Sequence, residues 1–296
     1  MTNNDFLLEL YCLVDENLKY VMPPQGLRPH GPEPTLADAE TLTIEIAGEY
    51  WSLDTDKAQF EFFRQYHRAE FPALAKIDRT TFARQAANLW LVAERLRQHL
   101  VLLLPMGLRD WSLFDSVTLR VCSFARAPRC RLFAGLASFG YDHLEKTTFY
   151  GFKLHLCCGI GGPVASCQIA PANVPDVDMV PETKPPEGGI GLGDRAYWDP
   201  QMQQDLKAEG FWLIAPFRKR TGDPYPALAH AVSRLRQTIE TTISQFAERF
   251  NAKWTWARDQ WHLCHRVIRK ILAHTACIVL TLRHGYPPLQ LERLMD

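Results

Sequence analysis

The sequence predicts an α/β fold in which an all-helical N-terminal region is followed by a mixed sheet flanked by helices. Two observations support this prediction. Apolar residues recur at helical spacing through the first 105 residues, whereas short apolar runs separated by Gly and Pro begin at Trp111. With 296 residues and 47% apolar composition, the chain can bury a full core and form two units.

Helical periodicity in the N-terminal region begins near the start of the chain and stops at a loop rich in proline. It returns after Thr35, which we expect to be the N-cap of a helix. The helical segments are expected at residues 5–20, 36–51, 57–71 and 78–104.

The segment DRTTFARQAANLW is the best candidate for a DNA recognition helix, because Arg79, Thr80, Arg84 and Gln85 cluster near its start. Residues 1–110 carry 11 Lys and Arg against 16 Asp and Glu, and this net charge of −5 argues against DNA binding. Dimerisation is an equally good use for such helices. We therefore assign residues 1–107 to a helical N-terminal DNA-binding or dimerisation domain.

The second part of the chain reads as strand, hairpin, short crossover, strand, helix, strand and long helix. The hairpin is expected to turn at Gly159 to Pro163. The expected elements are a strand at 111–122, hairpin strands at 147–160 and 162–174, a short strand before Asp194, a helix at 200–208, a strand at 211–217, and helices from Ala227 past Glu240 and over 261–282.

Charge and hydropathy bound the function. The net charge of the chain is zero, but residues 231–296 carry 10 Lys and Arg against 5 Asp and Glu, so a face that binds polyanions is expected to be richest toward the C-terminus. No stretch approaches the ~18 apolar residues of a membrane span, and acidic residues stand where a signal peptide would be basic. We expect a cytoplasmic protein without a membrane partner.

Three carboxylates stand out. Asp115 lies inside an apolar, β-branched run, where burying a carboxylate costs several kcal/mol unless it is compensated. Asp194 follows a short Gly-rich run, and Glu240 lies on a helical pattern. Singly, each has a structural explanation: an Asp at a strand end is often a turn residue, and Glu240 can pair with Arg236 four residues earlier. Together, in this order, they favour a site for two Mg²⁺ ions that act on a phosphodiester.

The ordered motifs FDSVTLRVC, FYGFKLHL, PANVPD, GDRAYW and RQTIETTISQF resemble those of bacterial insertion-sequence transposases of the DDE class, including the insertion sequence 982-like group. The similarity runs from about Trp111 to His274 and implies a ribonuclease H-like catalytic domain, which we place at 108–296 with a helical C-terminal extension. It implies metal-dependent DNA cleavage and strand transfer with Mg²⁺, or Mn²⁺ as a substitute. It also implies terminal inverted repeats and target DNA as substrates, a homodimer on DNA ends, and a location with the bacterial nucleoid.

The resemblance assigns roles residue by residue. Asp115, Asp194 and Glu240 match the three catalytic, metal-binding acids, and Arg236 matches the arginine that precedes the third acid. Ser233 and Ala247 stand where the family signature has Tyr and Lys, so two donors expected to hold the DNA end are absent, and Arg249 is a partial substitute. The expected DNA contacts are Arg236, Lys153, His155, Arg126, Arg129, Arg218, Lys219, Arg220, Arg249 and Arg266.

The segment from Ala252 to Thr275 interleaves tryptophans with basic residues, which suits distorted DNA. Its aliphatic residues are expected to face the core, and its basic residues, among them Arg266, Arg269 and Lys270, to line the opposite, solvated face, with the arginines facing DNA. Two alternatives stay open for the chain. One is a structure-selective nuclease on the same fold, and the other is a DNA-binding protein derived from a transposase that has lost catalysis.

Overall fold

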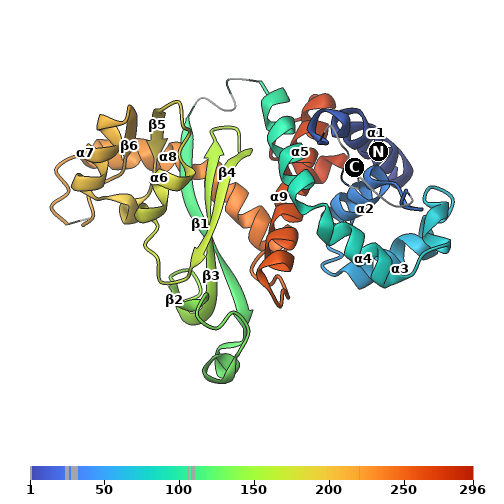
Figure 1. The fold of residues 1–296 in the computed structure, drawn as a ribbon. Coiled ribbons are helices and arrows are strands. Elements are labelled where there is room, and N and C mark those ends of the chain that lie inside the picture. Colours follow the sequence, from blue (N-terminus) through green and yellow to red (C-terminus); the bar gives the residue numbers. More distant parts are fainter. Residues whose placement is uncertain are drawn as a thin grey trace. The chain divides into compact units, whose positions relative to one another are not determined.

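The computed structural model describes residues 2–23, 27, 33–105, 107, 111–219 and 221–295 (Figure 1). The chain forms two compact units. Unit 1 comprises Met1–Leu103, Arg249–Asn251 and Ala257–Asp296, and unit 2 comprises Leu104–Glu248 and Ala252–Trp256. No described helix is long and apolar enough to cross a membrane.

Unit 1 is built from helices whose apolar faces meet in one core, as the spacing of their apolar residues requires. The helices are α1 (Asn3–Val21), α2 (Asp38–Tyr50), α3 (Asp56–Tyr66), α4 (Arg79–Asn88), α5 (Trp90–Leu103) and α9 (Gln260–Arg283), with short 3-10 turns η1 (Pro72–Ala75) and η7 (Leu291–Leu294). Leu13, Ile46, Leu96 and Ile271 are each fully buried. The all-helical character predicted for the N-terminal region is confirmed.

One local expectation for unit 1 was wrong. Helix α2 is capped at Ala37, not at Thr35, because the carboxylate of Glu40 accepts a hydrogen bond of 2.7 Å from the Ala37 amide. Helix α9, part of the helical extension that the sequence assigns to 108–296, packs against α2 and α5 of unit 1. Residues around most of the circumference of α9 are buried. A helix of this kind needs neighbouring helices on more than one side to cover it.

The basic residues of α9 do not line a solvated face. Arg269 and Lys270 are each 2% exposed. Arg269 Nε donates to Glu49 at 2.5 Å and its Nη1 donates to Asp56 at 2.7 Å, while Lys270 Nζ donates to the other Glu49 oxygen at 2.6 Å. The expectation that these two side chains are solvated, with Arg269 facing DNA, was wrong, because α2 buries acids that need cationic partners.

Unit 2 holds a six-stranded mixed sheet in the order β2-β3-β1-β5-β6, with β4 pairing with β3. The strands are β1 (Ser112–Cys122), β2 (Ser138–Asp142), β3 (Thr147–Gly159), β4 (Val164–Pro171), β5 (Gly189–Leu192) and β6 (Phe211–Ile214), with helices α6 (Val180–Thr183), α7 (Pro200–Ala208) and α8 (Pro226–Ser244). Strand β5 pairs in parallel with β1 and with β6. Strand β3 pairs in antiparallel register with β1, β2 and β4. This is the predicted fold class, a mixed sheet with flanking helices.

The predicted hairpin is present, since β3 and β4 pair in antiparallel register and the Gly162 amide donates to the Gly159 carbonyl at 2.8 Å. Strand β2 was not predicted, because SFGYD is short and contains a glycine. It pairs with the first part of β3, from Ser138 opposite Gly151 to Asp142 opposite Thr147.

The core of unit 2 packs β1, which carries Asp115, beside β5, which precedes Asp194. Phe114 of β1 packs with Tyr197, Leu206 and Phe211 in one buried cluster. The ring centroids of Phe114 and Phe211 are 5.9 Å apart, in an edge-on arrangement. Gly191 of β5 has room only for hydrogen, since a Cβ there would lie 2.5 Å from the Phe114 ring. This close approach holds β5 directly beside β1.

Candidate active site

Asp115 and Asp194 lie where two parallel strands separate. The pairing of β1 with β5 covers Ser112 opposite Gly191 and Leu113 opposite Leu192. Asp115 follows two residues later on β1, and Asp194 follows two residues after the end of β5. Asp115 thus lies on β1 just beyond the stretch paired with β5, and Asp194 lies just beyond the end of β5, close enough for its charge to act on Asp115.

Glu240 comes from α8, which packs against β1. Arg236, one turn earlier on the same helix, joins it to Asp115: its Nη2 donates to Asp115 Oδ2 at 2.8 Å, and its Nη1 lies 3.9 Å from Glu240 Oε1. The Arg236 side chain is 9% exposed and that of Glu240 is 57% exposed. The helix salt bridge considered for Glu240 therefore exists, but the same guanidinium also pairs with Asp115.

The environment of Asp115 opposes its charge. Burial raises its pKa to about 6, against the lowering effects of the Arg236 guanidinium and of the Ser116 amide, which donates to Asp115 Oδ1 at 2.8 Å. The carboxylates of Asp194 and Asp176 raise the pKa further. Asp194 and Asp176 are thus close enough to Asp115 for their charges to oppose its ionisation, an effect that additional positive charge would relieve.

Asp194 and Glu240, the second and third acids, line the same surface hollow. Asp194, Arg236 and Glu240 line it together with Arg195, Pro216, Ala229, Val232 and Ser233. We call it the acidic hollow. Ser233, which replaces the tyrosine of the family signature, lies in its wall. Asp115 connects to this hollow through its ion pair with Arg236.

The donor chemistry of the three acids suits a divalent cation, because carboxylate oxygens are what Mg²⁺ prefers. As arranged, however, Arg236 lies within ion-pair distance of both Asp115 and Glu240. Among the described residues, no group of three His, Cys, Asp or Glu side chains is placed to hold a metal ion. The three carboxylates are the type of ligand that a divalent cation needs, and in this arrangement the Arg236 guanidinium supplies the positive charge beside Asp115 and Glu240.

Asp176, in the loop after β4, belongs to the site although the sequence reasoning gave it no role. Its Oδ1 accepts from Lys153 Nζ at 3.0 Å and from the Ser116 hydroxyl at 3.2 Å. Lys153 also donates to the Val174 carbonyl at 3.1 Å. The motif PANVPD was the available signal, but the sequence alone did not show that its aspartate reaches the strand that carries Asp115.

Lys153 and His155 lie beside this aspartate, not on an open surface. His155 is 2% exposed, and its Nδ1 is 3.5 Å from Asp176 Oδ1. Burial lowers the pKa of His155 to about 4 despite the Asp176 carboxylate, so the ring is neutral at pH 7. The structure corrects the expectation of a phosphate contact from His155, because a buried neutral imidazole offers no charge to DNA.

Tyr197 was also missed. It is 2% exposed, and its pKa is raised well above 10 by burial and by the carboxylates of Asp176, Asp115 and Asp194. A Cβ on Gly193 would lie 2.4 Å from its ring, so Gly193 and Tyr197 pack tightly on either side of Asp194 in the chain. Asp194 Oδ1 accepts from the Ala196 amide at 2.8 Å, which closes this turn.

The basic loop after β6 is fastened close to the acidic hollow. Arg195, in the wall of the hollow, donates to the Phe217 carbonyl and forms an ion pair of 3.1 Å with Asp223. Arg218 and Lys219 are exposed on the loop between these anchors. Arg220 lies outside the described residues. The position of the loop supports its expected contact with DNA.

The remaining expected DNA contacts have different surroundings. Arg126 and Arg129 are exposed in a 3-10 segment after β1. In unit 1, Arg249 lies over the Tyr50 ring, 4.9 Å from its centroid. Arg266, also in unit 1, is 15% exposed and lies 3.5 Å from Asp56. Its expected role as a DNA contact stays a prediction, and to fulfil it the guanidinium would have to leave Asp56.

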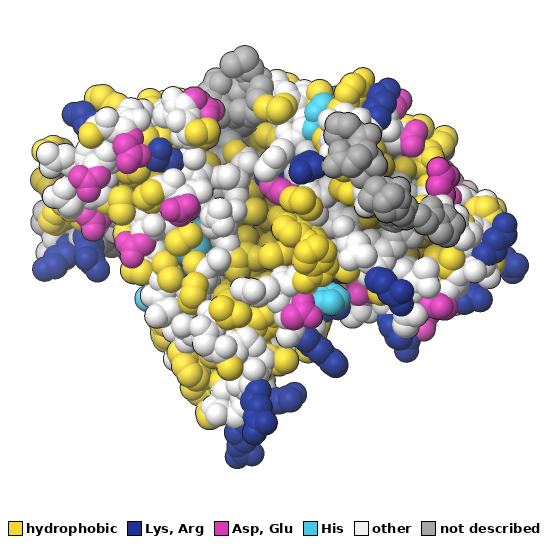
Figure 2. Space-filling model, viewed as in Figure 1, with side chains coloured by type: hydrophobic (Ala, Val, Ile, Leu, Met, Phe, Trp, Pro, Cys, Tyr) yellow, Lys and Arg dark blue, Asp and Glu magenta, His cyan; other side chains and the backbone are white. Residues whose placement is uncertain are grey.

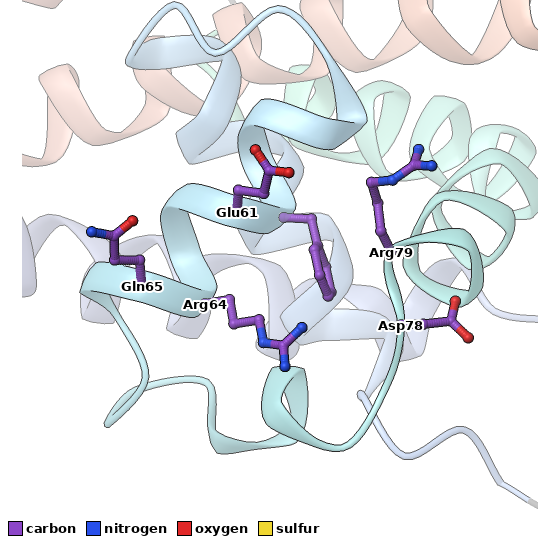
Figure 3. Close-up of a pocket in the computed structure, with 6 residues that line it drawn as sticks. Glu61, Arg64, Gln65, Asp78 and Arg79 are labelled. Carbon is purple, nitrogen blue, oxygen red and sulfur yellow. The ribbon is translucent and has the colours of Figure 1, made fainter.

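Unit 1 has hollows of its own. Glu61, Arg64, Asp78 and Arg79 line one between α3 and the start of α4 (Figure 3). Asp78 is engaged as the N-cap of α4, accepting from the Thr81 amide at 2.7 Å. Two acids balance two arginines there, and no member of the predicted triad takes part.

Comparison with known proteins agrees with the geometry of unit 2. The family described as transposase DDE domain matches residues 108–259, just over half of the chain and a range that includes Asp115, Asp194 and Glu240. Searches of curated proteins and of solved structures gave no match. The helical N-terminal region, the mixed sheet with flanking helices and this match agree with one another, and the chain belongs to the transposase DDE domain family.

Proposed function

We propose that the chain is a transposase that cleaves DNA strands and transfers them by divalent-metal-dependent chemistry, with Asp115, Asp194 and Glu240 as its catalytic, metal-binding acids. One observation carries the proposal: the Arg236 guanidinium joins Asp115 to Glu240, and Arg236 and Glu240 share a hollow with Asp194. The acids come from a central strand, the end of a parallel strand and a covering helix, which is the arrangement the family match leads us to expect.

The three carboxylates would hold Mg²⁺, or Mn²⁺ in its place, and a bound divalent ion lowers the pKa of a water and stabilises a leaving oxygen. For this the Arg236 side chain has to turn from Asp115. Its guanidinium would then be free to bind a DNA phosphate beside the acids, which suits a planar, bidentate donor. Lys153, fixed by Asp176, keeps a positive charge close to the strand that carries Asp115.

Family membership implies that the protein binds DNA. Within unit 2 the exposed residues Arg218 and Lys219, on the loop fastened by Arg195, are the nearest candidates to the acidic hollow. Such contacts act through phosphates, so the affinity should fall steeply with salt concentration. Terminal inverted repeats and target DNA as substrates, and a homodimer on the DNA ends, are part of this proposal.

Unit 1 is proposed to bind DNA or to dimerise. The exposed side of α4 carries Arg79, Thr80, Arg84 and Asn88. Arg79 and Arg84 are the basic residues of the expected recognition helix. Gln85 is buried and donates to the Leu36 carbonyl at 2.8 Å, so it serves the core instead. The exposed face of α4 borders a groove that also contains Trp261 and His262.

The test is cleavage of labelled duplex DNA that carries the ends flanking the gene, with Mg²⁺ or Mn²⁺. Wild type, Asp194→Asn and Glu240→Gln are compared with Asp178→Asn, an exposed aspartate outside the site. Cutting at the element boundary by wild type and Asp178→Asn, with loss in both triad variants while DNA binding persists, is the expected result.

Two outcomes would contradict the proposal. Cleavage that survives both triad substitutions would remove these acids from the mechanism. DNA binding without cleavage by any of the four proteins would favour a disabled relative, for which Ser233 and Ala247 provide a cause that restoring Tyr and Lys can test.

A further inference from the structure

The segment that follows β1 projects from the sheet as an arginine-rich tip, residues 123–137. It contains the 3-10 segment η3 (Phe124–Arg129) and lies at the end of β1 and β3 that is farthest from β5 and β6 (Figure 1). Arg126, Arg129 and Arg131 are all exposed on it. Figure 2 shows Lys and Arg side chains gathered at this projecting end.

The tip is anchored at its base. Phe133 is 7% exposed and meets the Phe152 ring of β3 edge-on, with centroids 5.2 Å apart. The Tyr150 hydroxyl lies 3.3 Å from the Leu132 carbonyl and 3.4 Å from that of Phe133, within donating distance of both. These contacts hold the base of the arginine-rich tip against β3.

The charge of the tip is not neutralised by acids of its own. No Asp or Glu occurs between Asp115 and Asp142 in the sequence. The acids that follow are already paired with other cations: Glu145 lies 2.5 Å from both Arg120 and Lys253, and Asp142 lies 3.3 Å from Arg120. Three adjacent guanidinium groups without local acids form a surface that suits a polyanion.

Aromatic side chains accompany the arginines. Phe124 is 56% exposed, Phe139 49% and Tyr141 47%. The rings of Phe124 and Phe139 meet edge-on, with centroids 6.4 Å apart. Exposed aromatic surface among guanidinium groups is a property of surfaces that bind nucleic acid, where rings contact bases or sugars and arginines contact phosphates. It distinguishes the tip from a simple solvated basic turn.

The distance from the tip to the acids defines which part of the DNA it can reach. Cys122 is seven residues beyond Asp115 on β1, and at about 3.3 Å per residue this separates them by roughly 23 Å. For a duplex that runs along β1, with a rise of about 3.4 Å per base pair, this span corresponds to about seven base pairs. We propose that the tip binds the phosphate backbone of duplex DNA about six to eight base pairs from the phosphate that is cleaved.

This inference rests on the proposed function, because it takes the phosphate at the acidic hollow as its reference point. It adds a second contact on the duplex, made by residues that do not touch the reacting atoms. Arg131, Phe124 and Phe139 join Arg126 and Arg129 in this contact. An acidic protein surface is the competing partner, and the test below separates the two.

The test uses duplexes of the gene's flanking ends that extend 4, 8, 12 or 16 base pairs on either side of the cleavage point. The variant carries Arg126→Gln, Arg129→Gln and Arg131→Gln. The control carries Lys57→Gln, Arg95→Gln and Lys207→Gln, three exposed cations outside the tip that also remove three charges. Affinity is measured by fluorescence anisotropy without divalent metal at several salt concentrations, and thermal unfolding checks that each protein is folded.

Wild type and control should gain at least tenfold in affinity when the flank grows from 4 to 12 base pairs, and the tip variant should lose that gain while binding the shortest duplex equally well. With three phosphate contacts removed, the slope of log affinity against log salt should fall by about 2.7 on the longer duplexes. Hydroxyl-radical footprinting should show loss of backbone protection six to eight base pairs from the cleavage point.

Equal length dependence in wild type and tip variant would overturn the inference, as would an equal loss on every duplex. A change in self-association in place of DNA binding would assign the tip to a protein contact and overturn it too. If wild type binds none of the end duplexes, the proposed function itself fails, and that result is distinct from a tip variant that matches wild type.

Discussion

Arg236 Nη2 lies 2.8 Å from Asp115 Oδ2, so a guanidinium from α8 neutralises the carboxylate on the central strand. The same guanidinium lies 3.9 Å from Glu240. Without this cation, Asp115 would face Asp194 and Asp176 with the Ser116 amide as its remaining direct partner, while Lys153 pairs with Asp176. The arrangement explains how the fold tolerates several acids in one place, and it makes Arg236 and a divalent cation competitors for Asp115.

Replacing Arg236 with Gln should lower the free energy of unfolding by about 1–3 kcal/mol, because Asp115 loses a charged hydrogen-bond partner. Millimolar Mg²⁺ should recover more stability in this variant than in wild type, since ligand binding to the folded state is no longer opposed by the arginine. Urea unfolding with and without Mg²⁺ measures both effects. Arg234→Gln, an exposed neighbour on α8, is the matched control. Identical behaviour of the two variants would remove Arg236 from this role.

Replacing Gly193 with Ala should impair cleavage more than folding. The new Cβ would lie 2.4 Å from the buried Tyr197 ring, so the turn that carries Asp194 has to shift. A displacement of about 1 Å at a catalytic group can cost about 100-fold in rate. Single-turnover cleavage of end DNA measures the loss. Gly107→Ala, where a Cβ meets no atom within 4 Å, should cleave at the wild-type rate. A Gly193→Ala protein as fast as wild type would show that the turn tolerates the methyl group.

Replacing Arg269 with Met should destabilise the protein by about 3–5 kcal/mol, because Glu45 and Glu49 would remain buried without this partner. Equilibrium unfolding in urea at pH 7 gives the number. Arg95→Met, an exposed arginine on α5, should change stability by less than about 0.5 kcal/mol. A similarly small effect for Arg269→Met would mean that its ion pairs contribute little to the fold.

His274 should make the protein sensitive to acid. It is fully buried, and burial lowers its pKa from 6.5 to about 3. The unfolded chain therefore binds a proton below pH 6.5 while the folded chain does not, so stability falls as the pH drops from 6.5 toward 3. Between pH 6.5 and 5 the loss should be about 2 kcal/mol. His274→Gln should remove this part of the pH dependence in urea titrations, and an unchanged slope would contradict the assignment.

The sequence predicted elements well where the signals are local. Helix α7 was expected at 200–208 and is found at Pro200–Ala208, because Asp199 caps it and a proline occupies its first turn. Strand β1 and the β3–β4 hairpin were expected for similar reasons of pattern and turn chemistry. The fold class followed from these elements and from the family motifs.

What the sequence could not give depends on contacts between distant residues. Arg269 reads as a surface residue of an amphipathic helix, and only its pairing with Glu49, 220 positions away, shows that it is buried. The same applies to Asp176, whose link to Ser116 spans 60 positions. Periodicity reports which face of a helix is apolar, but it does not report which polar residues find partners inside.

The central claim is that Asp115, Asp194 and Glu240 together bind the divalent cation used for cleavage. The most direct test is a titration of Mn²⁺, followed by electron paramagnetic resonance, into the protein bound to its end DNA. Asp115→Asn, Asp194→Asn and Glu240→Gln are compared with wild type and Asp178→Asn. We expect wild type and Asp178→Asn to bind Mn²⁺ alike and each triad variant to bind at least tenfold more weakly. Unchanged Mn²⁺ affinity in the triad variants would contradict the claim.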